Sequence, residues 1–309
     1  MARTTVAVVA HSGKKLGGGL SELRRVLRRA GYARPIWREV PKSRKAPKAV
    51  RRAVKKGARL IFVWGGDGMV QRCVDALAGT KNVEIAILPA GTANLLATNL
   101  GIPKQIAQAV NIGLHGARRR LDVGVINGER FAVMAGAGFD AIMMRNADTA
   151  RKKRLGRLAY FRSGVKAMRA PAVPMTVQVD GTTWFEGKAS AVLFGNVGTA
   201  TGGLKLFPDA ADDDGMLEVG VVTARSVGQW LRVLSRVARG RPEGSPFVEM
   251  TRGRKVAVRL SRKLAYEADG GVRRATKRLK VRVVGRAIVV RAPRSATFSE
   301  SKGRAGSDI

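Results

Sequence analysis

The chain has 309 residues, of which 45% are hydrophobic, so it is long enough for one large domain or two ordinary ones with a sizeable core. Its single cysteine, Cys73, excludes an internal disulfide and indicates a reducing compartment such as the cytoplasm. We expect Cys73 to be a small buried side chain. No apolar stretch reaches the roughly 18 residues of a membrane span, so work at a membrane would be done from its surface.

The charge is strongly positive, with 58 Lys+Arg against 22 Asp+Glu and a formal net charge of +36. Such a charge attracts polyanions, whether nucleic acid, anionic lipid headgroups or nucleotide phosphates. A solvated surface in an arginine-rich proteome is the alternative interpretation. Nucleic-acid binding is a weaker hypothesis, because aromatic residues make up only 5% and no helix-turn-helix, zinc or RNA-stacking motif is present.

The first 115 or so residues alternate strand-like and helix-like patterns. Strands are predicted at residues 4–10, 36–40, 60–64 and 83–88, and helices at residues 20–30, 46–56, 70–78 and after residue 94. Strands that alternate with helices of this length predict a mostly parallel sheet covered on both faces.

From about residue 120 the pattern changes to short strands and turns. Strands are predicted at residues 175–179, 189–194, 256–260, 280–284 and 287–290, with turns at Asp180-Gly181 and Glu186-Gly187. This half is predicted to be an antiparallel sandwich, interrupted by helical segments near residues 151–169 and 226–239. The small polar tail after Pro293 is expected to be disordered.

Two glycine-containing loops follow neighbouring predicted strands. Gly65-Gly66-Asp67-Gly68 comes after the third strand, and residues 89–94 (PAGTAN) come after the fourth. Glycines at strand ends let the backbone approach phosphate oxygens, and a following helix offers free N–H groups. Neither loop matches GxGxxG or GxxxxGK[ST], but loops at adjacent strand ends predict one ligand crevice.

These loops, with five further motifs, resemble the diacylglycerol kinase catalytic family of lipid kinases, which includes sphingosine and ceramide kinases. The motifs are GGDG (65–68), LPAGTANLLATNLGIP (88–103), LDVG (121–124), AGAGFDA (135–141), Gly195-Asn196 with Gly202-Gly203, PDAADDDG (208–215) and Asp269-Gly270. The resemblance extends to about Pro293. It implies an ATP-dependent kinase that phosphorylates the hydroxyl of a membrane lipid such as diacylglycerol.

The same resemblance implies an N-terminal α/β nucleotide-binding domain with a mostly parallel sheet and a C-terminal antiparallel β-sandwich domain. We place the nucleotide-binding domain at residues 1–120 and the lipid-substrate sandwich at residues 121–284. Residues 285–293 are expected to form a strand that returns to the first domain, and residues 294–309 a disordered tail.

Positions that match the family motifs give the expected ligand contacts. The nucleotide is expected to contact Ser12, Gly13, Lys14, Gly65, Gly66, Asp67, Gly68, Gly91, Thr92 and Asn94. ATP and Mg²⁺ are the implied cofactors, and a magnesium-related role suits Asp67. The alternative is that Asp67 only fixes its turn through backbone hydrogen bonds.

The family assigns roles to carboxylates in the second half as well. Asp269 matches the general base that takes the proton of the lipid hydroxyl; the alternative is an ordinary Asp-Gly turn like Asp180-Gly181. Asp214 matches a residue that helps bind a structural Mg²⁺, and Asp122 matches a carboxylate linked to that ion through water. A solvated acidic turn is the alternative for Asp214.

The chain departs from the family pattern at Met69, Arg72, Leu95 and Gly271, where the family has a threonine and three acidic residues. Fewer carboxylates should weaken Mg²⁺ binding, so a divergent kinase with another acceptor and a non-catalytic nucleotide or lipid sensor both stay open. NAD kinases share the GGDG loop, but their other motifs are not evident here.

Two basic amphipathic segments could contact an anionic membrane surface, at residues 151–169 and 229–241. For residues 229–241 we expect the apolar side to pack on the sandwich. For residues 151–169, packing on the sandwich and contact with a membrane are both left open. We therefore expect a cytoplasmic protein that associates peripherally with membranes and binds no specific nucleic acid. A homodimer is left open.

Overall fold

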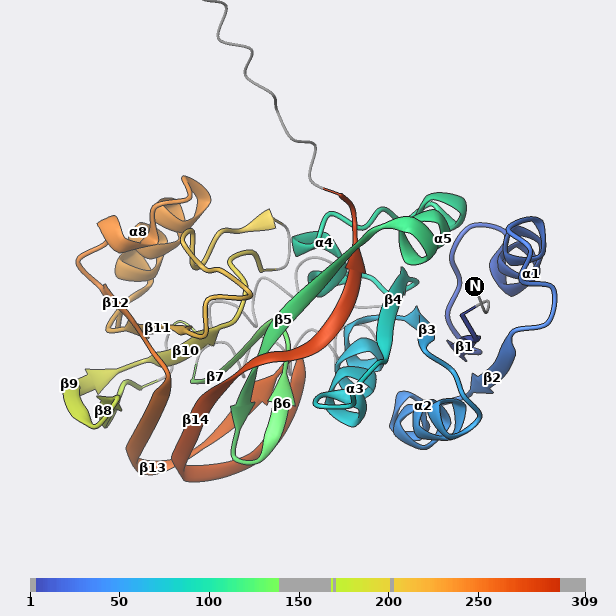
Figure 1. The fold of residues 1–309 in the computed structure, drawn as a ribbon. Helices are drawn as coiled ribbons and strands as arrows, with labels where there is room; N and C mark the ends of the chain where they lie inside the picture. Colours follow the sequence, from blue (N-terminus) through green and yellow to red (C-terminus); the bar gives the residue numbers. More distant parts are fainter. Residues whose placement is uncertain (1–3, 139–167, 169–170, 201–202, 295–309) are drawn as a thin grey trace, which may run out of the picture.

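The computed structural model describes residues 4–138, 168, 171–200 and 203–294. Figure 1 shows two halves side by side, an α/β half that contains the N-terminus and a half made mostly of strands. The fold class predicted from the sequence, a parallel α/β domain followed by an antiparallel β-sandwich, is confirmed.

The N-terminal half is built on a parallel sheet in the order β4-β3-β1-β2. Its strands are β1 (Val6–His11), β2 (Ile36–Val40), β3 (Leu60–Gly65) and β4 (Glu84–Pro89). Its helices are α1 (Gly19–Arg29), α2 (Ala46–Lys55), α3 (Asp67–Leu77), α4 (Leu95–Asn99) and α5 (Ile106–His115), with a 3-10 turn at Ser43–Lys45. Helices α1 and α5 cover one face of the sheet, and α2 and α3 cover the other (Figure 1).

The central strands are apolar on both faces because helices cover both. Every residue of β3 and β4 is buried, as expected for strands inside a doubly covered parallel sheet. The helices are amphipathic: α1 buries Leu23 and Leu27 and turns its arginines to solvent.

The C-terminal half contains antiparallel strands. They are β5 (Ala117–Ile126), β6 (Glu129–Phe131), β7 (Met134–Gly138), β8 (Val173–Val179), β9 (Thr182–Ala189), β10 (Ala191–Gly195), β11 (Leu217–Val222), β12 (Val248–Gly253), β13 (Lys255–Ala268) and β14 (Gly271–Ala292). Helix α8 (Val227–Ala238) and a 3-10 turn at Pro242–Gly244 lie between β11 and β12. A second apolar core fills the sandwich, separate from the core of the α/β half.

Strand β14 joins the two halves. It is 22 residues long, pairs with β13 and β5, and then pairs in parallel with β4 through Val289 and Val290 (Figure 1). Near this junction, the Glu84 carboxylate is paired with Arg118 and Arg291. The hydrogen-bonded sheet is therefore continuous from the sandwich into the α/β half.

Two details of the predicted strands were wrong. Residues 280–284 and 287–290 are not separate strands but parts of β14, and the break between them is an irregularity opposite β5 where Arg286 has φ 52°. Glu186-Gly187 is not a turn, because both residues lie inside β9. The Asp180-Gly181 turn is confirmed, with positive φ at both residues.

Helix α8 confirms the packing expected for the second amphipathic segment. Ser226 and Gln229 form a capping box at its start, and Trp230, Val233 and Val237 are buried against the sandwich. The first amphipathic segment, residues 151–169, lies outside the described residues except for residue 168, and so does the tail from residue 295. Within the described ranges, no helix is both long enough and apolar enough to cross a bilayer.

Candidate active site

Three loops meet at one edge of the parallel sheet, because β1, β3 and β4 are neighbours that all end there. The Trp64 ring N–H donates to the Lys14 carbonyl over 3.2 Å and ties the first loop to the second. The Ala90 N–H donates to the Gly65 carbonyl over 2.9 Å and ties the second to the third. These loops contain the residues expected at the nucleotide, namely Ser12, Gly13, Lys14, Gly65, Gly66, Asp67, Gly68, Gly91, Thr92 and Asn94.

The first loop is shaped by His11, which the sequence analysis did not single out. Its Nδ1 accepts the Gly13 N–H over 3.1 Å, and its carbonyl accepts the Lys14 N–H. Burial lowers the pKa of His11, and the nearby Lys14 charge lowers it further, which suits a neutral ring that accepts through Nδ1. Ser12 and Gly13 remain exposed at the loop surface.

The second and third loops touch through glycine backbones. A Cβ on Gly91 would lie 2.4 Å from the Gly66 Cα and 2.7 Å from the Asn94 Oδ1. Glycine at residues 66 and 91 therefore lets the two loops pack together. A Cβ on Gly68 would meet nothing within 4 Å, and Thr92 is exposed, so this side of the crevice is open.

Asp67 holds these two loops together. It is the first residue of α3, and its carboxylate accepts the Asn94 N–H over 3.0 Å and the Leu95 N–H. Asn94 has a left-handed φ of 53°, and its side-chain oxygen accepts the Gly91 N–H over 2.8 Å. Asp67 therefore does fix a turn through backbone hydrogen bonds. The turn is not its own but the one at Asn94 in the neighbouring loop.

Asp269 lies at the turn between β13 and β14 and is 5% exposed. Its carboxylate accepts the N–H groups of Ala132, Val133 and Met134 at 2.7, 2.9 and 3.1 Å. Burial raises the pKa of Asp269 to about 6; the three N–H donors oppose this rise, and the Asp67 charge adds to it. The backbone thus holds a buried carboxylate whose pKa is raised above that of an exposed aspartate.

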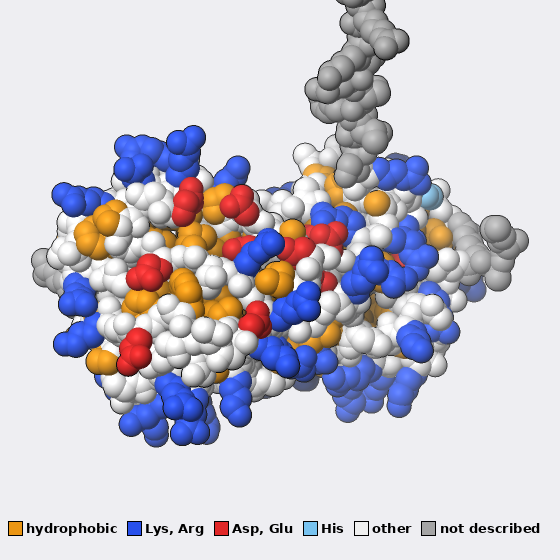
Figure 2. Space-filling view, turned by 60° about the vertical axis from the view of Figure 1, so that its left-hand side comes forward, with side chains coloured by type: hydrophobic (Ala, Val, Ile, Leu, Met, Phe, Trp, Pro, Cys, Tyr) orange, Lys and Arg blue, Asp and Glu red, His pale blue; other side chains and the backbone are white. Residues whose placement is uncertain are grey.

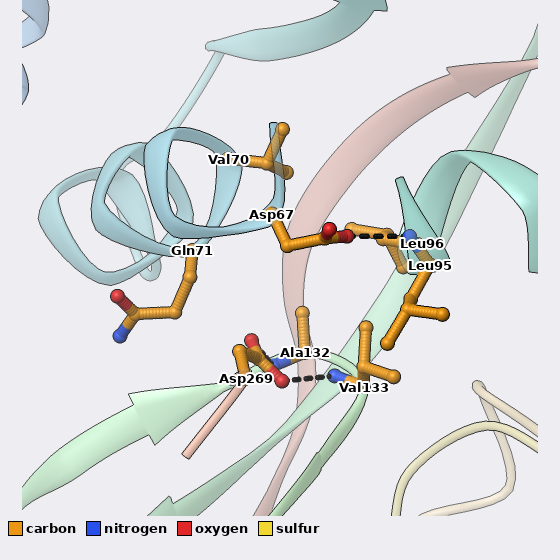
Figure 3. Close-up of a pocket in the computed structure, with 8 residues that line it drawn as sticks. All are labelled: Asp67, Val70, Gln71, Leu95, Leu96, Ala132, Val133 and Asp269. Carbon is orange, nitrogen blue, oxygen red and sulfur yellow. Dashed lines mark hydrogen bonds between the residues drawn. The ribbon is translucent and has the colours of Figure 1, made fainter. Parts of the chain in front are cut away.

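Asp67 and Asp269 face one small cavity from opposite sides (Figure 3). Its volume is about 10 Å³, close to what one water molecule needs. It is lined by Asp67, Val70, Gln71, Leu95, Leu96, Ala132, Val133 and Asp269. The cavity therefore lies between Asp67, at the start of α3, and Asp269, in the turn after β13.

The inner face of α3 explains one departure from the family pattern. Met69 is buried, and its Cβ lies 2.5 Å from where a Cβ on Gly65 would be, so the glycine makes room for it. Cys73 is buried on the same helix, and burial raises the pKa of its thiol to about 12. The expectation that Cys73 is a packed apolar side chain is confirmed.

Two other departures, Arg72 and Gly271, lie beside charged side chains. Arg72 lies close enough to Glu129 to lower the pKa of that carboxylate, after a larger lowering by Arg273. The space beside Gly271 is filled by the Arg273 guanidinium, since a Cβ there would lie 2.3 Å from its Nη1. Sequence reasoning missed Glu129 and Arg273; the only signal was that acidic residues such as Glu129 are scarce in this chain.

The predicted metal residues do not line this cavity: Asp122 lies within β5, and Asp214 lies in the loop before β11. Both carboxylate oxygens of Asp122 accept backbone N–H groups at 2.6 Å, one from Gly215 and one from Arg286. Asp214 accepts the Met216 N–H and lies 3.6 Å from Arg252. The structure therefore brings Asp122 to the loop that carries Asp214.

Further carboxylates gather around this loop. Burial raises the pKa of Asp212; Arg119 opposes the rise, and the charges of Asp213 and Asp122 add to it. Figure 2 shows most acidic side chains across the middle of one face, with some basic side chains among them and more basic ones along the edges. Within the ranges that the structure describes, no three His, Cys, Asp or Glu side chains are placed to hold a metal together. Asp214 is exposed and could hold a hydrated hard cation directly, whereas Asp122 is 1% exposed with both oxygens accepting N–H groups and could contact such an ion only through water.

Both halves of the chain match models of known protein families. Residues 3–126 match the diacylglycerol kinase catalytic domain, and residues 133–292 match the YegS C-terminal NAD kinase beta sandwich-like domain. The chain belongs to the diacylglycerol kinase catalytic-domain family. This confirms the resemblance on which the sequence motifs were interpreted.

Similar proteins cover most of the chain. A diacylglycerol kinase of Mycobacterium tuberculosis is 31% identical over 71% of this chain and 72% of its own length. A diacylglycerol kinase of Bacillus subtilis is 29% identical over 73% of this chain and 75% of its own length. A solved structure of a diacylglycerol kinase from Bacillus anthracis has a TM-score of 0.75 at 22% identity and covers 93% of this chain and 96% of its own. An NAD kinase from Archaeoglobus fulgidus in complex with ATP has a TM-score of 0.51 at 12% identity. The match covers 93% of this chain and 92% of that one.

Two alanine substitutions should separate loop packing from ligand access. Gly91→Ala forces a Cβ against Gly66 and should lower the free energy of unfolding by about 1–3 kcal/mol, measured by urea denaturation. Gly68→Ala, within the first turn of α3, should leave stability unchanged or raise it by about 0.5–1 kcal/mol but weaken nucleotide binding in calorimetry. Equal loss of stability in both variants would contradict the loop contact.

Proposed function

We propose that this chain is an ATP-dependent kinase that phosphorylates the hydroxyl of a membrane lipid such as diacylglycerol. The family makes it a kinase that acts on a lipid; the donor and the acceptor are our proposal. The observation that carries it is the cavity where Asp67 of the nucleotide crevice and Asp269 face each other.

The crevice suits the phosphates of ATP. Ser12, Gly13, Gly68 and Thr92 are exposed on three adjacent loops, and Lys14 adds a cation at the same edge. Backbone N–H groups and a lysine at the ends of parallel strands are the groups that commonly bind phosphate oxygens. Bound there, ATP would supply the γ-phosphoryl group to be transferred.

Asp269 is placed to act as the general base. Its carboxylate takes the proton of the acceptor hydroxyl while the hydroxyl oxygen bonds to the γ-phosphorus and the bond to the leaving ADP breaks. The pKa of about 6 leaves the carboxylate ionised at neutral pH yet more basic than an exposed aspartate. Since Asp269 is buried, the hydroxyl has to reach it from the side of the cavity.

The first test is transfer of labelled phosphate from ATP to diacylglycerol, sphingoid bases and ceramide in anionic micelles with Mg²⁺. We expect transfer to at least one lipid, with kcat/KM falling about tenfold per pH unit below about pH 6 as Asp269 gains its proton. Asp269→Asn should lower kcat by about 10²-fold or more and remove this acidic limb.

Asp180→Asn is the matched control, because Asp180 also begins an Asp-Gly turn and its carboxylate also accepts backbone N–H groups, from Arg254 and Lys255. Each substitution places an amide nitrogen against N–H donors, so both should lower the melting temperature. Only Asp269→Asn should affect turnover. Wild-type turnover in Asp269→Asn would reduce that residue to a turn former, and no transfer to any lipid would count against the kinase proposal.

We propose that Asp214 binds a hydrated Mg²⁺, linked through water to Asp122, and that this ion braces the loop at residues 212–215. In that case Mg²⁺ should raise the melting temperature of the wild type, since an ion that binds only the folded state stabilises it. Asp214→Asn should lose most of this rise, whereas Asp213→Asn, with the same charge change on an exposed neighbour, should keep it. An equal rise in both variants would mean that Mg²⁺ binds elsewhere.

The outer face of β13 and β14 suits an anionic membrane surface. Exposed cations oppose each other across the two strands, Lys255 against Arg282 and Arg259 against Arg278. Like charges directly opposite are destabilising, and within the described ranges these cations form no ion pair. With Lys280, they lie at or beside a groove of about 700 Å³ between the Asn127-Gly128 and Asp180-Gly181 turns.

Replacing three of these cations should weaken membrane binding more than replacing three others. The triple variant Lys255→Gln, Lys280→Gln, Arg282→Gln should bind phosphatidylglycerol vesicles about 10²-fold less tightly in sedimentation, from about 1 kcal/mol per cation. The control triple on α2, Lys48→Gln, Arg51→Gln, Lys55→Gln, has the same charge change and should bind nearly as the wild type. Equal losses of vesicle affinity in the two triple variants would show that the protein is attracted by its net charge alone.

A non-catalytic nucleotide or lipid sensor is the second candidate, favoured by the apolar Leu95 at the cavity and by Gly271 beside Asp269. Nucleotide binding in calorimetry without turnover on any acceptor would favour it. Measurable phosphoryl transfer would end it.

A further inference from the structure

A buried polar side chain connects α3 to the sandwich half. Gln71 is 4% exposed and lies one turn after Asp67 on α3. Its amide nitrogen donates to the Arg130 carbonyl over 2.7 Å and to the Glu129 Oε1 over 3.3 Å. Both acceptors belong to β6, so this one amide links the helix of the nucleotide crevice to a strand of the other half.

Glu129 continues the connection into β14. Its two carboxylate oxygens accept from the Nε and Nη2 of Arg273, a bidentate arrangement that fixes the orientation of both side chains. Arg273 follows Asp269 by four residues, and its guanidinium fills the space beside Gly271. The same carboxylate thus contacts α3 and the beginning of the strand that follows the candidate base.

Strand β6 also leads directly into the groups that hold Asp269. The N–H groups of Ala132, Val133 and Met134, which follow Phe131 at the end of β6, all donate to the Asp269 carboxylate. Asp67 and Asp269 therefore lie at the two ends of one short path, from α3 through Gln71 and β6 to the Asp269 turn.

We propose that Gln71, Glu129 and Arg273 are positioning residues that set the placement of Asp269 relative to the nucleotide loop. The inference rests on the proposed kinase function and goes beyond it, because it assigns three side chains a role in placing Asp269 rather than in the transfer itself. Reacting groups need near-ideal separation and angle, and a misplacement of about 1 Å can cost up to about 10²-fold in rate. A path that spans both halves of the molecule controls that separation.

Glu84 provides a matched control for this arrangement. Its carboxylate is also partly buried and also paired with arginines, Arg118 and Arg291. It is the first residue of β4, whereas the nucleotide crevice follows the last residue of that strand. Breaking this cluster should therefore affect stability without affecting the site.

The experiment compares Gln71→Met, Glu129→Gln and Arg273→Met with Glu84→Gln. We expect the first three variants to lower kcat by about 10-fold or more, while the affinity for a non-hydrolysable ATP analogue changes by less than about twofold. Glu84→Gln should lower the melting temperature and keep wild-type kcat. A loss of kcat in the control, or wild-type kcat in the three variants, would overturn the proposal.

Two further variants distinguish positioning from loss of folding. Arg273→Lys keeps the charge and one donor and should recover part of kcat. The double variant Gln71→Met, Arg273→Met should lose little more than the more affected single variant, because both interrupt the same path. Fully additive losses, or no recovery with lysine, would contradict a shared positioning role.

Hydrogen exchange tests the path without any kinase assay. In Gln71→Met the Ala132, Val133 and Met134 amides should exchange about 10-fold faster than in the wild type, since their partner Asp269 is held less firmly. Glu84→Gln should leave them at wild-type rates. If the wild type phosphorylates no lipid but these amides respond as expected, the kinase proposal fails and the path stands; unchanged exchange overturns the path.

Discussion

The candidate site depends on the carboxylate of Asp67. Its hydrogen bonds to the Asn94 and Leu95 N–H groups hold the third loop against the second, at the point where Gly66 and Gly91 are in backbone contact. Without this carboxylate the start of α4 would have an unpaired N–H facing the cavity, and the left-handed turn at Asn94 would lose its support. Every other feature of the crevice is arranged around this fixed pair of loops.

The few acidic residues in this basic chain are used in two different ways. Asp67, Asp122 and Asp269 accept backbone N–H groups from segments far away in sequence, and so fix loops and turns. Glu84 and Glu129 pair instead with arginines and tie strands or helices across the junction of the two halves. Hydrogen bonds to backbone N–H groups stabilise a carboxylate without bringing a counter-ion into the site.

The sequence predicted the parallel sheet well because its strands are continuous apolar runs that end at turn residues, as β3 ends at Gly65 and β4 at Pro89. It could not predict the length of β14, since Gly285 and Arg286 look like a turn and only pairing with β5 makes them a bulge. The path from Gln71 to Glu129 joins residues 58 positions apart. A single polar residue on a helix carries no signal of such a partner, so tertiary structure alone reveals it.

Two departures from the family pattern, Leu95 and Gly271, leave fewer negative charges around Asp269. A carboxylate near another carboxylate disfavours ionisation, and Asp67 already adds to the rise in the pKa of Asp269. An acidic side chain at Leu95, which lines the cavity, or at Gly271 would raise that pKa further, whereas this chain has an apolar group at one position and the Arg273 guanidinium in the space beside the other. Neither Leu95 nor Gly271 therefore adds a negative charge that would raise the pKa of Asp269 above about 6. The acidic side chain at the junction of the two halves is instead Glu129 on β6. It is paired with Arg273, and its pKa is also lowered by Arg72.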